Sequence, residues 1–219
     1  IGKNGANTFT MTTTDTAITS PNGGTANAYA GLEILNNIFG GTGAYTGIDL
    51  KNDFDSATIT ITDNTFSGNG GYKGIFTTHG NPTLTNNDMT GILDTGISIS
   101  GGTALIKKSD ITSTGKAGKG IVLSGSGSYT LGTDGDDTDA NTLELLATGI
   151  ELNTAQTVNI YNNFIGTSGN QNTKGIHTTT TDNGTATLKN NHFDNTTSIH
   201  LAANTTLNST DDTIANSTT

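Results

Sequence analysis

A Gly-Ile dipeptide recurs along this chain, and each copy opens a short run in which apolar and polar residues alternate. The steps between successive copies are 27, 22, 24, 29 and 26 residues, within the range of stacked repeat architectures. Alternation with a period of two residues is the pattern of a strand. Each repeat therefore has room for two or three short strands and their turns. The six copies begin at Gly47, Gly74, Gly96, Gly120, Gly149 and Gly175.

A second pattern keeps step with the first. It is a pair of small polar residues, usually including Asn, set between two hydrophobic positions. Asn tolerates left-handed backbone, and its amide can bond an identical amide on the next coil. We therefore predict a stacked Asn ladder at a turn, and a tight corner at each Gly before Ile, where a Cβ would obstruct the chain. The pairs begin at Asn36, Asp63, Asn86, Lys108, Asn162 and Asn190.

The composition limits what these repeats can build. The 219 residues are only 31% hydrophobic, so an ordinary globular interior would be thin. The absence of Cys excludes disulfides and thiolate sites. All nine basic residues are Lys and the net charge is −10, which excludes nucleic-acid binding. No run of about 18 apolar residues is present, so we expect no membrane insertion.

Stacking resolves the shortage of apolar residues. Successive coils can lie about 4.8 Å apart, each strand bonding its counterpart above, in parallel sheets around a narrow interior. Burying four or five aliphatic side chains per coil yields roughly 6–15 kcal/mol, and ordering the coil costs at least as much. One coil alone cannot fold. The predicted interior file consists of Ile48, Ile75, Ile97, Ile121, Ile150, Ile176 and Ile199.

We expect one domain over residues 1–219. Residues 1–29 are predicted to form an irregular first coil, 30–201 the regular coils, and 202–219 a Thr/Asn-rich terminal coil or tail. Neither end has the polar or helical cap that repeat arrays use to hide their edges. The expected partners are therefore other copies of the chain, or further coils of a longer one, stacked end to end.

The repeats resemble the right-handed parallel β-helix repeats of pectate-lyase-like proteins. Residues 163–167 before Gly175, and residues 131–134 before Asn141, look in particular like the tandem-repeat β-helices of large bacterial surface and secreted proteins. The resemblance covers about residues 30–201. It implies an all-β, single-stranded right-handed parallel β-helix of about eight coils, with 22–30 residues per coil, and an extracellular or cell-surface location.

The enzymes among these pectate-lyase-like proteins cleave acidic polysaccharides. The lyases use a basic residue, commonly Arg, near a calcium-holding carboxylate cluster, and the hydrolases use Asp pairs with further Asp, His and Arg-Lys motifs. This chain has no Arg, and its one adjacent Asp pair outside the tail, Asp136 and Asp137, has no Gly-His-Gly motif beside it; the nearest approach is at His79. We expect no catalytic residue, no required cofactor and no enzyme activity.

Two metal sites are conceivable. Asp134, Asp136, Asp137 and Asp139 gather four carboxylates within six residues and could hold Ca²⁺; the alternative is a solvated acidic loop. Glu151, His177 and His200 are expected to form an outward column on adjacent coils, about 4.8 Å apart, which could share a transition metal. The alternative there is that three polar residues simply face solvent.

Three further outward patterns suggest binding surfaces. Tyr45 and Tyr72 precede Gly-Ile by two residues and could stack as a platform for sugars. Phe76 and Val122 fall in one outward column and could form an apolar patch. The pairs Thr60/Thr62 and Thr83/Thr85 resemble a flat ice-binding face, but the pattern is interrupted at Glu33 and at Leu105, and two coils do not make an ice plane.

From these patterns we predict a non-enzymatic extracellular structural rod. It would be a surface adhesin or passenger segment, or a subunit that stacks end to end into a filament. The alternative is a polysaccharide-binding or polysaccharide-degrading module. A groove lined with carboxylates and Lys would favour that module, with surface glycans as partners, and flat faces covered with Thr and Asn would favour the rod.

Overall fold

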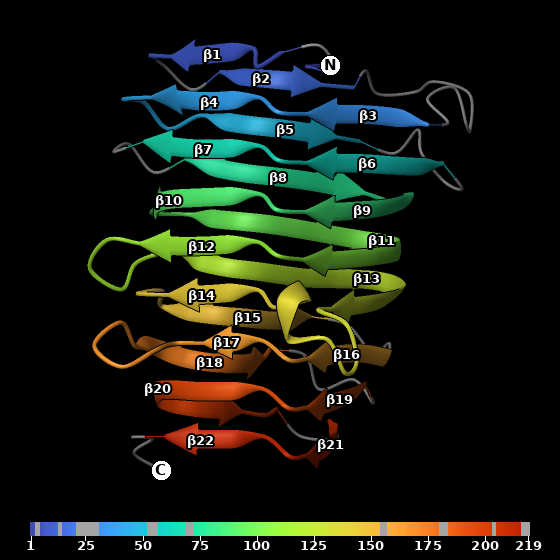
Figure 1. Ribbon diagram of the computed structural model, residues 1–219, viewed down its shortest axis with the longest axis vertical. Coiled ribbons are helices and arrows are strands. Elements are labelled where there is room, and N and C mark those ends of the chain that lie inside the picture. Colours follow the sequence, from blue (N-terminus) through green and yellow to red (C-terminus); the bar gives the residue numbers. More distant parts are fainter. Residues whose placement is uncertain are drawn as a thin grey trace.

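The computed structural model describes residues 1–2, 5–12, 15–20, 31–51, 57–68, 72–153, 157–179, 184–202 and 205–215. These residues form a right-handed parallel β-helix, as the sequence predicts. Successive coils lie one below another along the long axis, from the N-terminal coil to the C-terminal coil (Figure 1). Each strand pairs in parallel with its counterpart on the neighbouring coil.

Each coil crosses three faces, which we call face one, face two and face three. Face one contains β2 (Thr16–Thr19), β5 (Thr46–Leu50), β8 (Lys73–Thr78), the first parts of β11 (Thr95–Lys107) and β13 (Lys119–Leu131), β15 (Thr148–Asn153), β18 (Asn172–Thr178) and the end of β20 (His192–His200). Face two contains β3 (Leu32–Leu35), β6 (Thr58–Thr62), β9 (Asn81–Thr85), the second parts of β11 and β13, β16 (Thr157–Tyr161), β19 (Thr185–Lys189) and β21 (Thr206–Thr210). Face three contains β1 (Thr8–Met11), β4 (Ile38–Gly41), β7 (Thr65–Gly68), β10 (Asp88–Ile92), β12 (Asp110–Ser113), β14 (Thr142–Glu144), β17 (Phe164–Ile165), the start of β20 and β22 (Thr213–Ala215).

The predicted isoleucine file is the spine of face one. Each member from Ile48 to Ile176 pairs in register with the next and is fully buried. Ile18 and the partly buried Ile199 extend the file at its two ends. Seven steps thus join eight isoleucines, in agreement with the expected stack of about eight coils.

Face three has its own inward file, and it begins with aromatic rings. Phe39 stacks on Phe9 with ring centroids 5.0 Å apart and on Phe66 with centroids 4.6 Å apart. Offset stacking of this kind adds to the stabilisation that burial of the rings already gives. Aliphatic side chains continue the file to Ile165, and Phe193 follows it at a buried position.

The Asn pairs form the corner between face two and face three, and their two members have different roles. The first member, such as Asn36 or Asn86, has φ of 55°, in the left-handed region that turns the chain. The second member is buried and forms the predicted ladder: Asn37 Nδ2 donates to Asn64 Oδ1 at 3.0 Å, and Asn64 Nδ2 donates to Asn87 Oδ1 at 3.0 Å. These turns are therefore held to the next by a buried amide, and on the coil of β12 the ladder position is Ser109, whose hydroxyl accepts a hydrogen bond from the Asn87 N–H at 3.4 Å.

The Gly residues before Ile are needed for a different reason from the one predicted. Those from Gly47 to Gly175 lie inside the strands of face one and do not have positive φ. Their space is occupied by neighbours: a Cβ on Gly74 would lie 2.4 Å from the carbonyl oxygen of Gly96 and 2.7 Å from Met89 Sδ. Close approach, and not a corner, requires glycine here.

The coil that contains residues 129–146 departs from the Asn-pair pattern, and we call it the irregular coil. It contains a short 3-10 turn, η1 (Asp137–Asp139), between β13 and β14, after which Asn141 re-enters the ladder by donating to Asn163 Oδ1 at 2.8 Å. At the ends of the described stack, β1 and β2 pair in register with β4 and β5, and β21 and β22 pair with β19 and β20.

Candidate functional site

Face one carries two columns of side chains that include ionisable groups. One column alternates Lys with Thr over five coils: Lys73, Thr95, Lys119, Thr148 and Lys174. The other is the column predicted from the Gly-Ile strands, in which Glu151 pairs in register with His177, and His177 with His200. The predicted order of residues in this outward column is therefore confirmed.

The carboxylate of Glu151 is already engaged by protein groups. Lys119 Nζ lies 2.8 Å from Oε1, and Asn153 Nδ2 donates to the same oxygen at 2.9 Å. The residue is only 5% exposed. Burial alone would raise the pKa of Glu151, but the hydrogen bonds from Lys119 and Asn153 outweigh it and lower this pKa. The group is a buried, paired carboxylate, and it lacks the raised pKa that a general acid needs.

The two histidines of the column contact each other. Their ring centroids are 4.9 Å apart in an edge-to-face arrangement, and Lys174 Nζ lies 3.3 Å from His177 Nε2. Burial, followed by the neighbouring charges of Lys174 and His200, lowers the pKa of His177. A neutral imidazole is the metal-binding form, but an ammonium group stands beside the nitrogen that would bind.

The acidic segment around η1 is divided among different partners. Asp139 is buried and accepts a hydrogen bond from Thr133 Oγ1 at 2.7 Å, and Lys107 and Lys108 lie 2.9 Å and 3.1 Å from its two oxygens. The hydrogen bond from Thr133, followed by that from Lys107, lowers the pKa of Asp139 to about 2. This carboxylate anchors the irregular coil to the strand above it.

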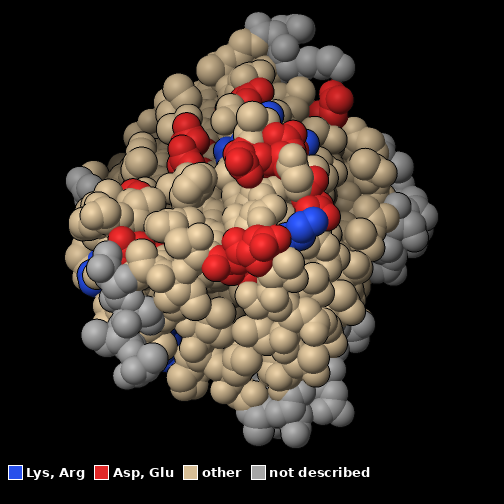
Figure 2. All heavy atoms as spheres, turned by 60° about the horizontal axis from the view of Figure 1, so that its bottom comes forward, with Lys and Arg blue, Asp and Glu red and all other residues tan. Residues whose placement is uncertain are grey.

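The other three carboxylates of that segment do not join Asp139. Asp134 pairs with Lys189 at 2.8 Å, Asp136 accepts hydrogen bonds from Thr138 at the start of η1, and Asp137 is exposed. Acidic side chains with a few Lys among them are prominent on the side shown in Figure 2, where the C-terminal coils come forward. Across the described ranges, no group of three or more His, Asp or Glu residues is placed to hold a metal ion.

The expected tyrosine platform is wrong. Tyr45 and Tyr72 do stack, with ring centroids 5.0 Å apart, but both are buried. Tyr72 Oη donates to the Thr90 carbonyl at 2.7 Å, and burial raises the pKa of Tyr45 to about 12. The stacking pattern is correct, but the side chains point into the interior, where no sugar can reach them.

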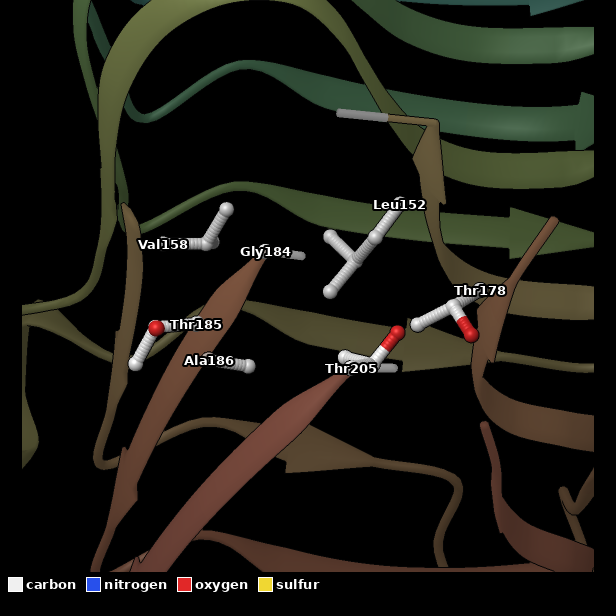
Figure 3. Close-up of a pocket in the computed structure, with 7 residues that line it drawn as sticks. All are labelled: Leu152, Val158, Thr178, Gly184, Thr185, Ala186 and Thr205. Carbon is white, nitrogen blue, oxygen red and sulfur yellow. The ribbon is translucent and has the colours of Figure 1, made fainter. Parts of the chain in front are cut away.

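Two hollows on the described part of the molecule differ greatly in size. A gap beside the ends of β15 and β18 is surrounded by Leu152, Thr178 and Thr205, whose side chains point toward its centre (Figure 3). Its volume of about 10 Å³ has room for roughly one water molecule. A groove of about 470 Å³ lies on the side of face one and is lined by Leu93, Asp94, Gly118, Lys119, Ala147 and Thr148.

Sequence reasoning did not identify three features of these surfaces. The Lys/Thr column and the anchoring role of Asp139 depend on which coil lies beside which, and that needs the register. The place of Asn141 in the ladder was not predicted, because the residues of η1 are inserted before it and break the spacing of the Asn pairs. A partial signal existed for the column, because Lys73, Lys119 and Lys174 each stand one residue before a Gly-Ile dipeptide.

Comparison with protein families gives one match. The model of the family described as "Periplasmic copper-binding protein (NosD)" matches residues 2–170, more than half of the chain. Comparison with curated proteins and with solved structures gives no significant match. No helix in the part of the chain described above is long and apolar enough to cross a membrane.

Proposed function

The chain belongs to the NosD family of periplasmic β-helix proteins, and we propose that it is a non-enzymatic structural rod outside the cytoplasm. It would be a segment of a surface adhesin, or a subunit that stacks end to end into a filament. The observation that supports this most strongly is the unbroken isoleucine file from Ile18 to Ile199. Because every coil contributes to this file, apolar contacts link the coils along the whole axis.

The lateral ladder supports the same role. Buried amides such as Asn64 and Asn163 each donate both to the amide of the next coil and to a carbonyl of the preceding one. Because repeat proteins are stabilised by contacts between neighbours, these bonds make bending or opening between coils costly. Rigidity is the property that a spacer or a filament subunit requires.

The state of the carboxylates supports the non-enzymatic part of the proposal. Glycoside cleavage by general acid and base requires two carboxyl groups flanking one substrate bond, one of them with a raised pKa. Burial, followed by the charges of Asp110 and Asp63, raises the pKa of Asp88, but this residue is exposed on β10. Asp139 and Glu151, which are buried, both have lowered pKa values and are bonded to Lys. Neither is free to donate a proton at neutral pH.

Copper binding, which the family description names, is not part of the proposal because the donors do not fit. Copper favours imidazole and sulfur ligands, and the chain has no Cys. Met11 and Met89 are buried in the core. His192 packs near Phe164, and the only two histidines in ring contact among the described residues, His177 and His200, have Lys174 beside them.

The proposal is tested by activity and assembly measurements on the purified chain. We expect no unsaturated product from polygalacturonate or alginate, and particles that are either elongated monomers or end-to-end filaments by electron microscopy and sedimentation. Steady release of unsaturated sugars would overturn the non-enzymatic role. Compact particles that neither elongate nor assemble at any concentration would overturn the rod.

The groove beside face one favours a second candidate, a polysaccharide-binding module. Lys119 and Asp94 line it, and Leu93, 38% exposed, adds apolar surface to its lining. Lys119→Gln should weaken retention of the chain by a polyuronate in affinity electrophoresis if this module is the function. Lys116→Gln is the matched control, because Lys116 is exposed and is not among the lining residues.

A further inference from the structure

The junction between the coils of β18 and β20 has two histidines in contact on the outward side of face one. His177 of β18 pairs in register with His200 of β20, and β20 follows β18 along the stack (Figure 1). The ring centroids of the two side chains are 4.9 Å apart, edge to face. Because histidine changes its charge near neutral pH, the contact between these two coils depends on the protonation of both rings.

The groups around this histidine pair are mostly basic. The titratable groups that face His177 are Lys174 on its own strand, Lys119 on β13, Glu151 on β15 and the ring of His200 on β20. Lys174 Nζ lies 3.3 Å from His177 Nε2. Glu151 is the one carboxylate of this set, and its Oε1 already bonds Lys119 Nζ at 2.8 Å. A proton added to His177 therefore gains little from Glu151 and is repelled by Lys174.

Acid changes the balance of charge at this contact. Burial, followed by the charges of Lys174 and His200, lowers the pKa of His177 from its ordinary value of 6.5. Because the folded pKa lies below the unfolded one, the neutral ring contributes fully to the free energy of unfolding above pH 6.5, and this contribution is lost as the pH falls through the folded pKa. When both rings are protonated, three positive groups stand in one row of contacts.

The interior of the stack is less enclosed at this junction than at the junctions just before it. Ile199 is only partly buried, whereas Ile150 and Ile176 are fully buried. Segments with few buried apolar contacts are the ones that open locally while the rest of a protein stays folded. A repulsion between side chains on the outside of this junction can therefore separate β18 from the end of β20 without unfolding the other coils.

We propose that this junction is an acid-sensitive opening point, at which protonation of His177 and His200 beside Lys174 loosens the pairing of β18 with β20. No covalent bond forms or breaks, so the junction closes again when the pH rises. Opening bares the backbone edge of β18 and the side chain of Ile176, a surface to which another strand can pair. This inference does not depend on the structural role proposed above.

Hydrogen exchange of backbone amides tests the proposal on the intact chain between about pH 8 and about pH 5. Mass spectrometry of peptides from β18 and the end of β20, corrected for the intrinsic effect of pH, gives the readout, and peptides from β8 are the internal reference. His200→Gln removes a ring charge at an exposed position, and Lys174→Gln removes the ammonium instead. His192→Gln is the matched control, because His192 lies on the same strand but on face three, beside Phe164. Circular dichroism establishes that the variants are folded.

We expect exchange in β18 and the end of β20 to become about tenfold faster in acid in the unmodified chain and in His192→Gln. In His200→Gln and in Lys174→Gln the acceleration should fall to about threefold or less, because one of the three positive groups is missing. Exchange that does not change with pH in the unmodified chain would overturn the proposal. An acceleration of equal size in His200→Gln and Lys174→Gln, or one spread evenly over all coils including β8, would overturn it as well.

Discussion

The two sides of the strands in face one follow different rules. Toward the interior, the same register position is Ile in eight successive coils. Toward solvent, a neighbouring position in the same strands changes at nearly every coil, from Asp49 and Phe76 to Glu151 and His177. The interior is constrained by contact with its own copies, whereas the outer surface is not.

Parallel stacking explains the contrast. It places each residue beside its counterpart about 4.8 Å away, so an apolar residue gains from repetition and a charged residue loses by it. The Lys/Thr column fits this rule, because Lys73, Lys119 and Lys174 are separated by Thr95 and Thr148. The substitutions below should therefore be costly inside and tolerated outside.

The largest effect is expected at the interior glycines. In Gly74→Val, the new side chain would meet the Gly96 carbonyl and Met89 Sδ, and overpacking of this kind should lower the free energy of unfolding by about 3 kcal/mol. Chemical denaturation measures the change. Gly40→Ala is the matched control, because its Cβ would meet only Ser67 at 3.5 Å. Equal stability of Gly74→Val and the unmodified chain would contradict the close-approach explanation.

The Asn ladder gives the next largest effect. Asn87→Leu removes the acceptor for the backbone N–H and the amide of Asn64, so it should lower the free energy of unfolding by about 2 kcal/mol. Asn86→Gly is the control. Asn86 is the preceding residue, its left-handed backbone suits glycine, and its amide donates a hydrogen bond to Asp63 at the surface. If the two substitutions cost the same in denaturation, the ladder does not hold the coils together.

The sequence predicts the interior of this molecule better than its surface, because interior residues are repeated from coil to coil and surface residues are not. Ile75 and Asn64 each have counterparts at similar intervals along the chain, so their stacking follows from the repeat alone. The partners of Asp139 do not recur: Lys107 and Lys108 lie on the preceding coil, and the insertion of η1 decides which coil faces which. The inward direction of Tyr45 also escaped prediction, because Tyr45 lies just before β5, outside the alternating run that gives each side chain a direction.

The next prediction concerns the ion pairs of Asp139, which occur on one coil and are not repeated along the stack. Asp139→Asn removes two ion pairs and should lower the free energy of unfolding by about 1.5 kcal/mol at neutral pH. The folded pKa of about 2 lies below the ordinary value of 3.8, so the stabilisation is present above pH 4 and is lost as the pH falls toward 2. The difference between the two proteins should therefore vanish in acid.

Urea unfolding at several pH values measures this difference. Asp137→Asn is the matched control, since Asp137 lies in the same turn and is exposed. A penalty for Asp139→Asn that persisted unchanged at pH 2 would show that packing, and not charge, anchors the coil.

The smallest expected effect has the opposite sign and concerns a polar residue inside the apolar file. Thr77 pairs in register with Leu50 and Ile99, is 2% exposed, and its hydroxyl has no hydrogen-bond partner among the described residues. Thr77→Val keeps the shape and removes this buried polar group, so it should raise the free energy of unfolding by about 1 kcal/mol. Thr178 lies further along the same file, but its hydroxyl accepts a hydrogen bond from the Ala202 N–H. Thr178→Val should therefore destabilise the chain, and a gain from both substitutions would mean that apolar volume alone governs the interior.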